Sequence, residues 1–265
     1  MNIKYKTLIF LTFVFSLFKQ SFAHELNKDE INSLINNFIL KNPQVIEKAL
    51  QNLNLERSKN NFEIALTELR KIPNPKLSST NSDITIYEFF DYNCGYCKSV
   101  MQNIFNIYKK DKKVEIVFVE YPILSNSSLS AAKASLASRN QKKYFEFHSK
   151  LMKHTGKIDD KLLLSFAKDL KINTKKLQSD YSNEKLMLII NKNREIAKRL
   201  NLRGTPAFII GNKIYPGAMS EKDIEKAIAI ERKKWILILE TLLKDEIYII
   251  NGPNLNKPVS YTHLR

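Results

Sequence analysis

The chain holds only two cysteines, and they stand two residues apart in the segment Cys94-Gly95-Tyr96-Cys97. A structural zinc site takes four cysteine or histidine ligands, and the sequence offers neither a second cysteine pair nor histidines at ligand spacing. A disulfide between residues i and i+3 closes a very short loop and removes little entropy from the unfolded chain. The spacing therefore indicates a redox-active dithiol that needs no cofactor. Paired thiolates also suit a soft cation, so copper(I) binding by Cys94 and Cys97 stays an alternative.

The cysteines lie where a strand pattern changes into a helix pattern. Ile84–Phe90 is an apolar β-type run, and an amphipathic helical pattern extends from about Cys94 to Lys110. Unpaired backbone N–H groups at a helix N-terminus favour an anion, so we expect Cys94 to attack disulfides as a thiolate. Cys97, one turn further along, is expected to be less exposed and to resolve the mixed disulfide.

Further elements predict an α/β domain over residues 84–235. A second β-branched run, Val114–Tyr121, predicts a strand parallel to the first in a right-handed βαβ unit. Residues from about 127 to 202 show several amphipathic helical patterns and no convincing strand. This order of elements predicts an α/β domain that is interrupted by a helical insert.

The elements after the insert predict a hairpin and a last helix. Ala207–Ile210 and Lys213–Tyr215 are joined by Gly211-Asn212, which is a typical two-residue hairpin turn. Ser220 with Asp223 has the pattern of a capping box at a helix start.

The first residues have the features of a secretory signal peptide. Two lysines precede an apolar run over residues 7–18, and Ser21-Phe22-Ala23 supplies small residues at the positions that a signal peptidase recognises. A run of about a dozen residues falls short of the ~20 that a membrane-spanning helix needs. We expect residues 1–23 to be removed after Ala23 and the protein to be periplasmic or otherwise exported, where dithiol chemistry is used.

Residues 24–72 predict a helical segment ahead of the domain. Four apolar residues within 31–38 share one helix face, and Asn42-Pro43 suits the start of a second helix. Such an apolar stripe either packs on the following domain or joins copies of the chain. Its heptad-like spacing favours an oligomerisation stalk, and the Pro-, Ser- and Asn-containing residues 73–83 are expected to form a linker.

The formal net charge of +16 raises the question of a nucleic-acid partner. Most of the excess comes from lysine, and the lysines are scattered over helical patterns rather than gathered in a stripe with aromatic residues. Arginine is the residue that reads bases and forms forked contacts to phosphates. The pattern is typical of a solvated basic surface, and we expect no nucleic-acid partner.

Two segments that stand far apart in the sequence carry the recognisable motifs of this chain. They are Glu88-Phe89-Phe90-Asp91-Tyr92-Asn93-Cys94-Gly95-Tyr96-Cys97-Lys98 and Gly204-Thr205-Pro206-Ala207-Phe208. Together they resemble the DsbA-like branch of the thioredoxin superfamily, and Leu40–Leu50 is similar to the N-terminal segment of its ScsC-type (suppressor of copper sensitivity) members. The resemblance implies a thioredoxin fold with an inserted helical domain, preceded by an N-terminal helical stalk. It also implies a cis peptide before Pro206 and, through the stalk, a trimer or other homo-oligomer.

The resemblance also implies roles for individual residues. Glu88 stands at the position of a buried acid, where burial would raise its pKa and let it relay a proton to or from Cys97. The alternative for Glu88 is a salt bridge at a sheet edge. Gly95 and Tyr96 are expected to contact the substrate, and backbone groups at Thr205-Pro206 to pair with an extended client chain.

These roles indicate an exported thiol-disulfide oxidoreductase that forms mixed disulfides with cysteine-containing client proteins. Gly-Tyr between the cysteines resembles isomerases more than the strongest oxidases, which favours a disulfide isomerase or shuffling enzyme. A membrane redox partner is expected to recycle the dithiol. The alternatives are a monomeric DsbA-like dithiol oxidase and a copper(I)-binding protein.

Three neighbouring residues have simpler interpretations. Asp91 is expected to cap the helix that starts at Cys94 or to interact with its dipole. Lys98 is expected to be a solvated charge in the first turn, and His148 to pack between helices of the insert rather than to bind a ligand.

The C-terminal residues do not continue the domain pattern. Ile247–Asn256 resembles the opening strand and loop of type II dehydroquinases, but too few residues follow to complete such an enzyme, and Lys257–Arg265 resembles neither family. We expect residues 247–265 to be poorly ordered or of artefactual origin.

Overall fold

The computed structural model describes residues 27–250, apart from the side chains of Ile238 and of residues 242–250. The chain forms two compact units, with the boundary between Asn60 and Asn61. The predicted signal peptide, residues 1–23, and residues 251–265 of the predicted tail lie outside the described residues. Residues 247–250 belong to the last helix, whereas the resemblance to a dehydroquinase indicates a strand there.

The first unit has no core of its own within the described residues. It consists of α2 (Lys28–Lys41) and most of α3 (Pro43–Lys71), which are separated at Asn42 as predicted. Asn27 forms a capping box with Glu30 at the start of α2. No residue of α2 is buried. The large exposed apolar side chains of this unit are Ile31, Leu34, Ile35, Phe38, Leu40, Val45, Ile46, Leu50, Leu53 and Leu55.

The end of α3 belongs to the second unit. Ala65, Leu66 and Leu69 are buried in the hydrophobic core of that unit. The helical segment that we expected to extend to residue 72 is therefore divided after residue 60. The last part of this segment packs on the domain, and self-association of its first part stays a prediction.

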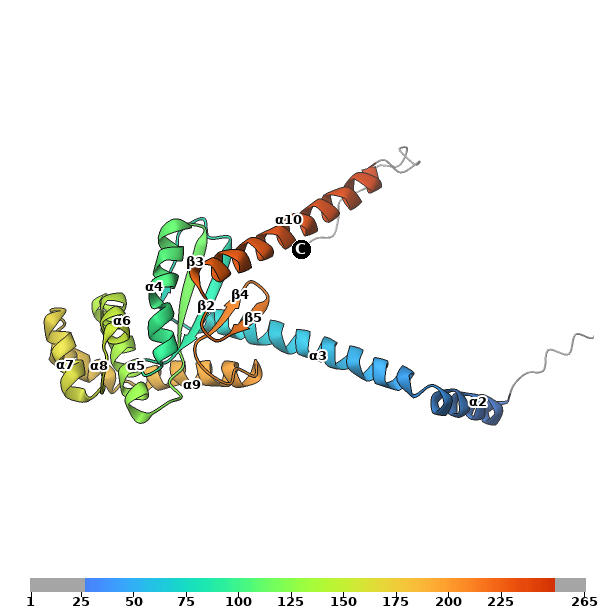
Figure 1. The fold of residues 1–265 in the computed structure, drawn as a ribbon, viewed down its shortest axis with the longest axis horizontal. Helices are drawn as coiled ribbons and strands as arrows, with labels where there is room; N and C mark the ends of the chain where they lie inside the picture. Colours follow the sequence, from blue (N-terminus) through green and yellow to red (C-terminus); the bar gives the residue numbers. More distant parts are fainter. Residues whose placement is uncertain (1–26, 251–265) are drawn as a thin grey trace, which may run out of the picture. The chain divides into compact units, whose positions relative to one another are not determined.

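The second unit is built on a mixed sheet that is flanked by helices (Figure 1). Its strands, in the described residues, are β1 (Lys76–Leu77), β2 (Ile84–Phe90), β3 (Val114–Glu120), β4 (Ala207–Ile210) and β5 (Lys213–Pro216). They lie in the order β1-β3-β2-β4-β5. β2 and β3 are parallel and are connected through α4 (Gly95–Lys110), as predicted. β2 is therefore a central strand, and its end leads directly to the cysteines.

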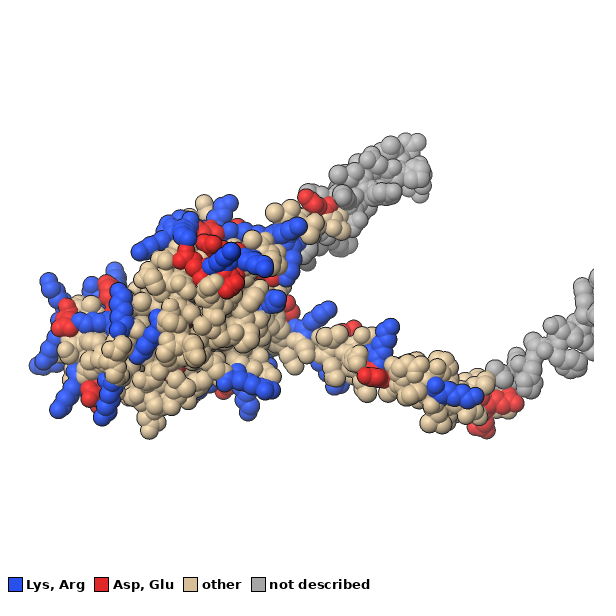
Figure 2. Space-filling model, in the orientation of Figure 1, with Lys and Arg blue, Asp and Glu red and all other residues tan. Residues whose placement is uncertain are grey.

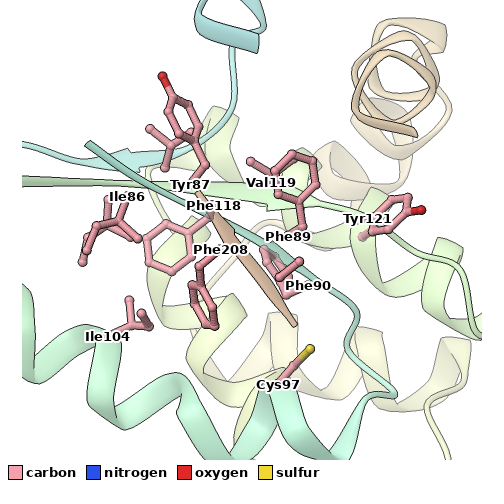
Figure 3. Close-up of a cluster of buried hydrophobic side chains, with 14 of the residues drawn as sticks. Ile86, Tyr87, Phe89, Phe90, Cys97, Ile104, Phe118, Val119, Tyr121 and Phe208 are labelled. Carbon is pink, nitrogen blue, oxygen red and sulfur yellow. The ribbon is translucent and has the colours of Figure 1, made fainter. Parts of the chain in front are cut away.

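The hydrophobic core fills the space between the sheet and α4. Successive side chains of a strand point to opposite faces, and Figure 3 shows Phe118 and Phe208 pointing from β3 and β4 towards α4, which carries Ile104 and Cys97. All of these side chains are fully buried. The N-terminal turn of α4 is thus held against the sheet by apolar packing.

The predicted linker, residues 73–83, contains a short strand that the sequence analysis missed. Lys76 and Leu77 of β1 pair antiparallel with Val117 and Ile116 of β3, and Phe118 N–H donates to the carbonyl of Pro75 at 2.8 Å. The outer edge of β3 would otherwise leave backbone groups without ladder partners. Two residues are too few to show an alternating pattern, so the pairing has no signal in the sequence.

The chain between β3 and β4 is helical, which confirms the predicted insert over residues 127–202. It forms α5 (Asn126–Ser138), the 3-10 turn η1 (Arg139–Gln141), α6 (Tyr144–Lys153), α7 (Asp160–Asp169), α8 (Thr174–Tyr181) and α9 (Glu184–Arg199). Side chains of Ser125, Asp159, Asn173 and Asn183 accept backbone N–H groups at the starts of α5, α7, α8 and α9.

The hairpin and the last helix also lie where they were predicted. Gly211 of the turn has φ +58, and a Cβ atom there would stand only 2.6 Å from Oε2 of the buried Glu231. Both the conformation and the contact favour glycine. Ser220 Oγ accepts the N–H of Asp223 at 3.2 Å ahead of α10 (Glu221–Ile250). Among residues 27–250, no helix is both long and apolar enough to cross a membrane.

Basic side chains are distributed over several helices on the face that Figure 2 shows, with acidic side chains among them. Some form ion pairs, such as Arg232 with Asp83 at 2.7 Å and with Asp111 at 2.6 Å. This face carries no single basic stripe of the kind that follows a nucleic-acid backbone. The expected absence of a nucleic-acid partner stays a prediction.

Candidate active site

Cys94 lies at the start of α4, as predicted. It is the N-cap residue, and its sulfur accepts a hydrogen bond from the backbone N–H of Cys97 (N to Sγ, 3.4 Å). Its thiol donates to the carbonyl oxygen of Thr205 over 3.2 Å. Both cysteines are free, and Cys94 is 6% exposed whereas Cys97 is fully buried. Cys94 is therefore the sulfur that a substrate can reach, at a helix end that stabilises its thiolate.

Cys97 is held as a neutral thiol. Burial raises its pKa, while the backbone of Asp91 and the side chain of Thr205 act in the opposite direction. A neutral thiol is a poor nucleophile until a base removes its proton. The two sulfurs therefore differ as the predicted roles require, with Cys94 suited to attack and Cys97 to a later step.

The Thr205-Pro206 peptide bond is cis, which confirms the prediction from the resemblance. This loop opens β4 and reaches Cys94 although 111 residues separate the two hydrogen-bonded positions. A pocket adjoins the loop, and its lining includes Leu202, Arg203, Thr205, Pro206, Ile214 and Pro216. Thr205 and Pro206 thus lie beside the reactive sulfur, and their role in client binding stays a prediction.

Glu88 faces the helix that carries Cys97. In the sheet it stands opposite Phe118 of β3 and Phe208 of β4, and register partners share one face. Its side chain is 1% exposed, and Oε1 has no hydrogen-bond partner among the described residues. Burial raises the pKa of Glu88 to about 8. Because β2 is central, the alternative of a salt bridge at a sheet edge is wrong.

Gly95 and Tyr96 form an exposed, uncharged surface next to Cys94. Tyr96 is 72% exposed, and a Cβ atom on Gly95 would meet no other atom within 4 Å. Neither residue can carry a positive charge beside the reactive sulfur. Their contact with substrate stays a prediction.

Asp91 does not cap α4, because Cys94 itself is the N-cap residue, so of its two expected roles only the interaction with the helix dipole stays a prediction. The buried carboxylate of Asp91 instead accepts the backbone N–H groups of Asn93, Ile123 and Leu124 at 2.8, 2.8 and 2.9 Å. Its backbone oxygen accepts the N–H of Cys94 at 3.1 Å. Asp91 therefore joins the loop before Cys94 to the loop that opens the insert.

Lys98 is not the fully solvated charge that we expected. It is half-buried in the first turn of α4, and its Nζ donates to the carbonyl oxygen of His154 at 2.7 Å. His154 is the C-cap residue of α6 in the insert. Burial lowers the pKa of Lys98, and the negative charges of Asp91 and Cys94 oppose that shift. Lys98 therefore links the redox centre to the insert.

A buried polar cluster near the redox centre was missed by the sequence analysis. Tyr92 and Tyr144 donate to Oε1 of Glu120 at 2.9 and 2.8 Å. The Tyr92 hydroxyl oxygen lies 2.7 Å from Oγ of Ser135 and 3.0 Å from Nδ1 of His148. Burial raises the pKa of Glu120 well above its usual range, against the hydrogen bonds from Tyr144 and Tyr92, and lowers the pKa of His148 to about 3. In the sequence, the one sign of this cluster was Glu120 at the end of the apolar run that forms β3.

His148 packs against aromatic rings of the sheet as well as of the insert, whereas we expected it to pack between helices of the insert. Its ring centroid lies 4.9 Å from that of Phe90 and 5.0 Å from that of Phe118. Within residues 27–250, no three His, Cys, Asp or Glu side chains are grouped so that they could hold a metal ion. The copper(I) alternative therefore depends on the sulfurs of Cys94 and Cys97.

The chain is similar to proteins of known structure and family. Residues 75–229 match the family model described as thioredoxin. A thioredoxin-like oxidoreductase from Silicibacter pomeroyi is 33% identical with a TM-score of 0.60, over 62% of this chain and 95% of that one. The thiol-disulfide exchange protein alpha-DsbA2 from Wolbachia pipientis is 28% identical with a TM-score of 0.61, over 66% of this chain and 95% of that one.

A third similar structure extends over more of the chain. ScsC from Proteus mirabilis in a transitional conformation is 22% identical with a TM-score of 0.60, over 79% of this chain and 98% of that one. At this identity the similarity shows the fold alone. The comparisons confirm the predicted fold and the predicted resemblance to DsbA-like and ScsC-type proteins.

Proposed function

We propose that this chain, which belongs to the thioredoxin family and is a thiol-disulfide oxidoreductase of the DsbA and ScsC type, isomerises disulfides in exported client proteins. The observation that carries the proposal is the position of Cys94 at the N-cap of α4, against the carbonyl of Thr205 next to cis-Pro206. A reactive sulfur there meets both a helix N-terminus and a backbone segment that can pair with an extended chain.

The reaction begins when the Cys94 thiolate attacks one sulfur of a client disulfide. The client S–S bond breaks, Cys94 forms a mixed disulfide, and the second client sulfur leaves as a thiolate. Another client thiolate then attacks the mixed disulfide, which forms a different client disulfide and regenerates the Cys94 thiolate. No net electrons are transferred in this cycle.

Cys97 and Glu88 act when a client does not rearrange. Glu88 in its ionised form accepts the proton of the Cys97 thiol, and the Cys97 thiolate attacks Cys94 in the mixed disulfide. The client sulfur leaves and takes up a proton, and a Cys94–Cys97 disulfide forms. A membrane redox partner then supplies two electrons and returns the pair to the dithiol state.

Two features favour isomerisation over simple oxidation. Gly95 and Tyr96 place no positive charge between the cysteines, so they do not add to the stability of the reduced form that makes a dithiol a strong oxidant. The exposed apolar side chains of α2 and the first part of α3 suit association of copies of the chain. Several dithiols in one assembly would hold a misfolded client through repeated exchange, because a second contact is made at high effective concentration.

A scrambled-ribonuclease assay tests the proposal. Reduced protein is expected to restore ribonuclease activity, Cys94→Ser to restore none, and Cys97→Ala to accumulate mixed disulfides. The isomerase proposal is rejected if reduced protein restores no activity. Activity only of the oxidised protein on reduced ribonuclease identifies a dithiol oxidase, and tight copper(I) binding without turnover identifies a metal-handling protein.

A further inference from the structure

We propose that Lys98 is a positioning residue of the redox centre: its ammonium group, held in place by the helical insert, stabilises the Cys94 thiolate. The inference rests on the thiol-disulfide exchange proposed above. It assigns a function to a side chain outside the C-x-x-C segment, and it makes the insert a part of the redox centre rather than only a cover.

The position of Lys98 is fixed from two sides. Its backbone N–H donates to the carbonyl of Cys94 at 3.1 Å within the first turn of α4. Its Nζ donates to the carbonyl of His154 at 2.7 Å, at the end of α6. A lysine side chain that ends on a fixed acceptor loses the freedom by which a solvated lysine avoids its neighbours. The ammonium is therefore kept near the N-terminus of α4.

A cation at this place is unfavourable unless an anion accompanies it. The N-terminal turn of a helix carries a partial positive charge, and α4 has no acidic residue in its first turn. Lys98 stands four residues after Cys94, the N-cap of α4, so the two side chains lie on the same side of the helix start. Negative charge at Asp91 and Cys94 opposes the lowering of the Lys98 pKa by burial. Lys98 is thus placed where it offsets negative charge at the start of the helix.

The two anions differ in one respect that makes the proposal testable. Asp91 takes no part in the exchange, and its carboxyl oxygens accept the N–H groups of Asn93, Ile123 and Leu124. Cys94 loses its charge when the reduced pair, one thiolate and one thiol, gives up two electrons and a proton to form the disulfide. Lys98 therefore stabilises the reduced form more than the oxidised form, and removal of its charge must shift the redox equilibrium towards the disulfide.

The test compares Lys98→Gln, Lys98→Arg and Lys153→Gln in the full-length protein. Lys153 is an exposed lysine at the same end of α6, so its replacement removes an equal charge without the contact to His154. The first measurement is the dithiol-disulfide equilibrium in glutathione buffers. The second is the rate at which iodoacetamide alkylates Cys94 in a Cys97→Ala background at one neutral pH.

Lys98→Gln is expected to shift the equilibrium about two- to fivefold towards the disulfide and to slow alkylation by a similar factor, as for a partly exposed ion pair. Lys98→Arg is expected to retain wild-type values, and Lys153→Gln to change neither. An unchanged equilibrium in Lys98→Gln, or equal shifts in the Gln and Arg variants, overturns the proposal and leaves Lys98 as a structural link between α4 and His154. Neither measurement needs a client, so failure of the ribonuclease assay alone leaves this inference standing.

Discussion

Burial distinguishes the two sulfurs of a segment only four residues long. Cys94 keeps a small exposed surface at the helix start, whereas Cys97 is fully buried and its pKa is raised. Glu88 lies on the same sheet face that packs against Cys97, and burial raises its pKa to about 8. A carboxyl group with that pKa can both accept and return a proton near neutral pH.

The raised pKa of Glu88 predicts a pH-dependent loss of stability. The folded protein keeps the Glu88 proton up to about pH 8, whereas the carboxyl of the unfolded chain loses it near its ordinary value of 4.5. The stabilisation from Glu88 is therefore fully present below pH 4.5 and is lost as the pH rises to about 8. The Glu88→Gln variant has no carboxyl group that titrates at this position. Its unfolding free energy should therefore fall less steeply between pH 4.5 and about 8.

Urea denaturation of both proteins at several pH values in this range measures the difference. Glu195→Gln, a change at an exposed position of α9, is the control and should keep the wild-type slope. Parallel pH profiles of wild type and Glu88→Gln would contradict the assignment of a buried, protonated Glu88.

The polar cluster around Glu120 connects side chains from several elements of the second unit. Tyr92 comes from the loop before Cys94, Glu120 from β3, Ser135 from α5, and Tyr144 and His148 from α6. Buried polar groups need hydrogen-bond partners, and here the partners come from a loop, a strand and two helices. The cluster therefore sets how the insert is attached to the sheet and to the active-site loop.

Tyr92→Phe is expected to lower the unfolding free energy by about 1–3 kcal/mol, because it keeps the ring but removes one of the two tyrosine donors to Glu120 and the hydroxyl that contacts buried Ser135 and His148. Chemical denaturation measures this loss. Tyr96→Phe, which removes a hydroxyl from a 72% exposed side chain, should change the free energy by no more than about 0.5 kcal/mol. Equal values for the two variants would show that the cluster contributes no net stability.

The described residues divide into a domain with a core and a helical unit, residues 27–60, without one. Residues 27–60 expose a series of large apolar side chains, while α3 from residue 61 onwards helps to form the core. Apolar faces of this size favour self-association in water. We therefore expect the first unit to determine the oligomeric state and the second unit to carry the redox chemistry.

Light scattering should show an oligomer for the mature protein and a monomer for a variant that lacks residues 27–60. Phe38→Glu, within the exposed apolar face of α2, should also weaken the oligomer, because it places a charge in the contact. Asn36→Glu adds the same charge on the opposite side of that helix and should leave the oligomer intact. A full-length protein that is monomeric at micromolar concentration would rule out the stalk.

Local patterns in the sequence were enough to predict most of the helices and strands. Periodicity and turn residues located β2, β3, α4, the hairpin at Gly211-Asn212 and the helices of the insert, because each depends on the preferences of neighbouring residues. The chemistry of Cys94 and Cys97 was predictable for the same reason, since their spacing and their place at a helix start are local. β1 and the division of α3 were not, because pairing and burial of those residues depend on distant surfaces.

The surroundings of the two sulfurs depend on tertiary contacts between distant parts of the chain. The contacts from Cys94 to Thr205 and from Lys98 to His154 join residues that are 111 and 56 positions apart. The raised pKa values of Glu88 and Glu120 likewise follow from burial by several elements at once. No periodic pattern records such contacts, because hydrogen bonding and desolvation depend on which side chains meet after the whole core has packed.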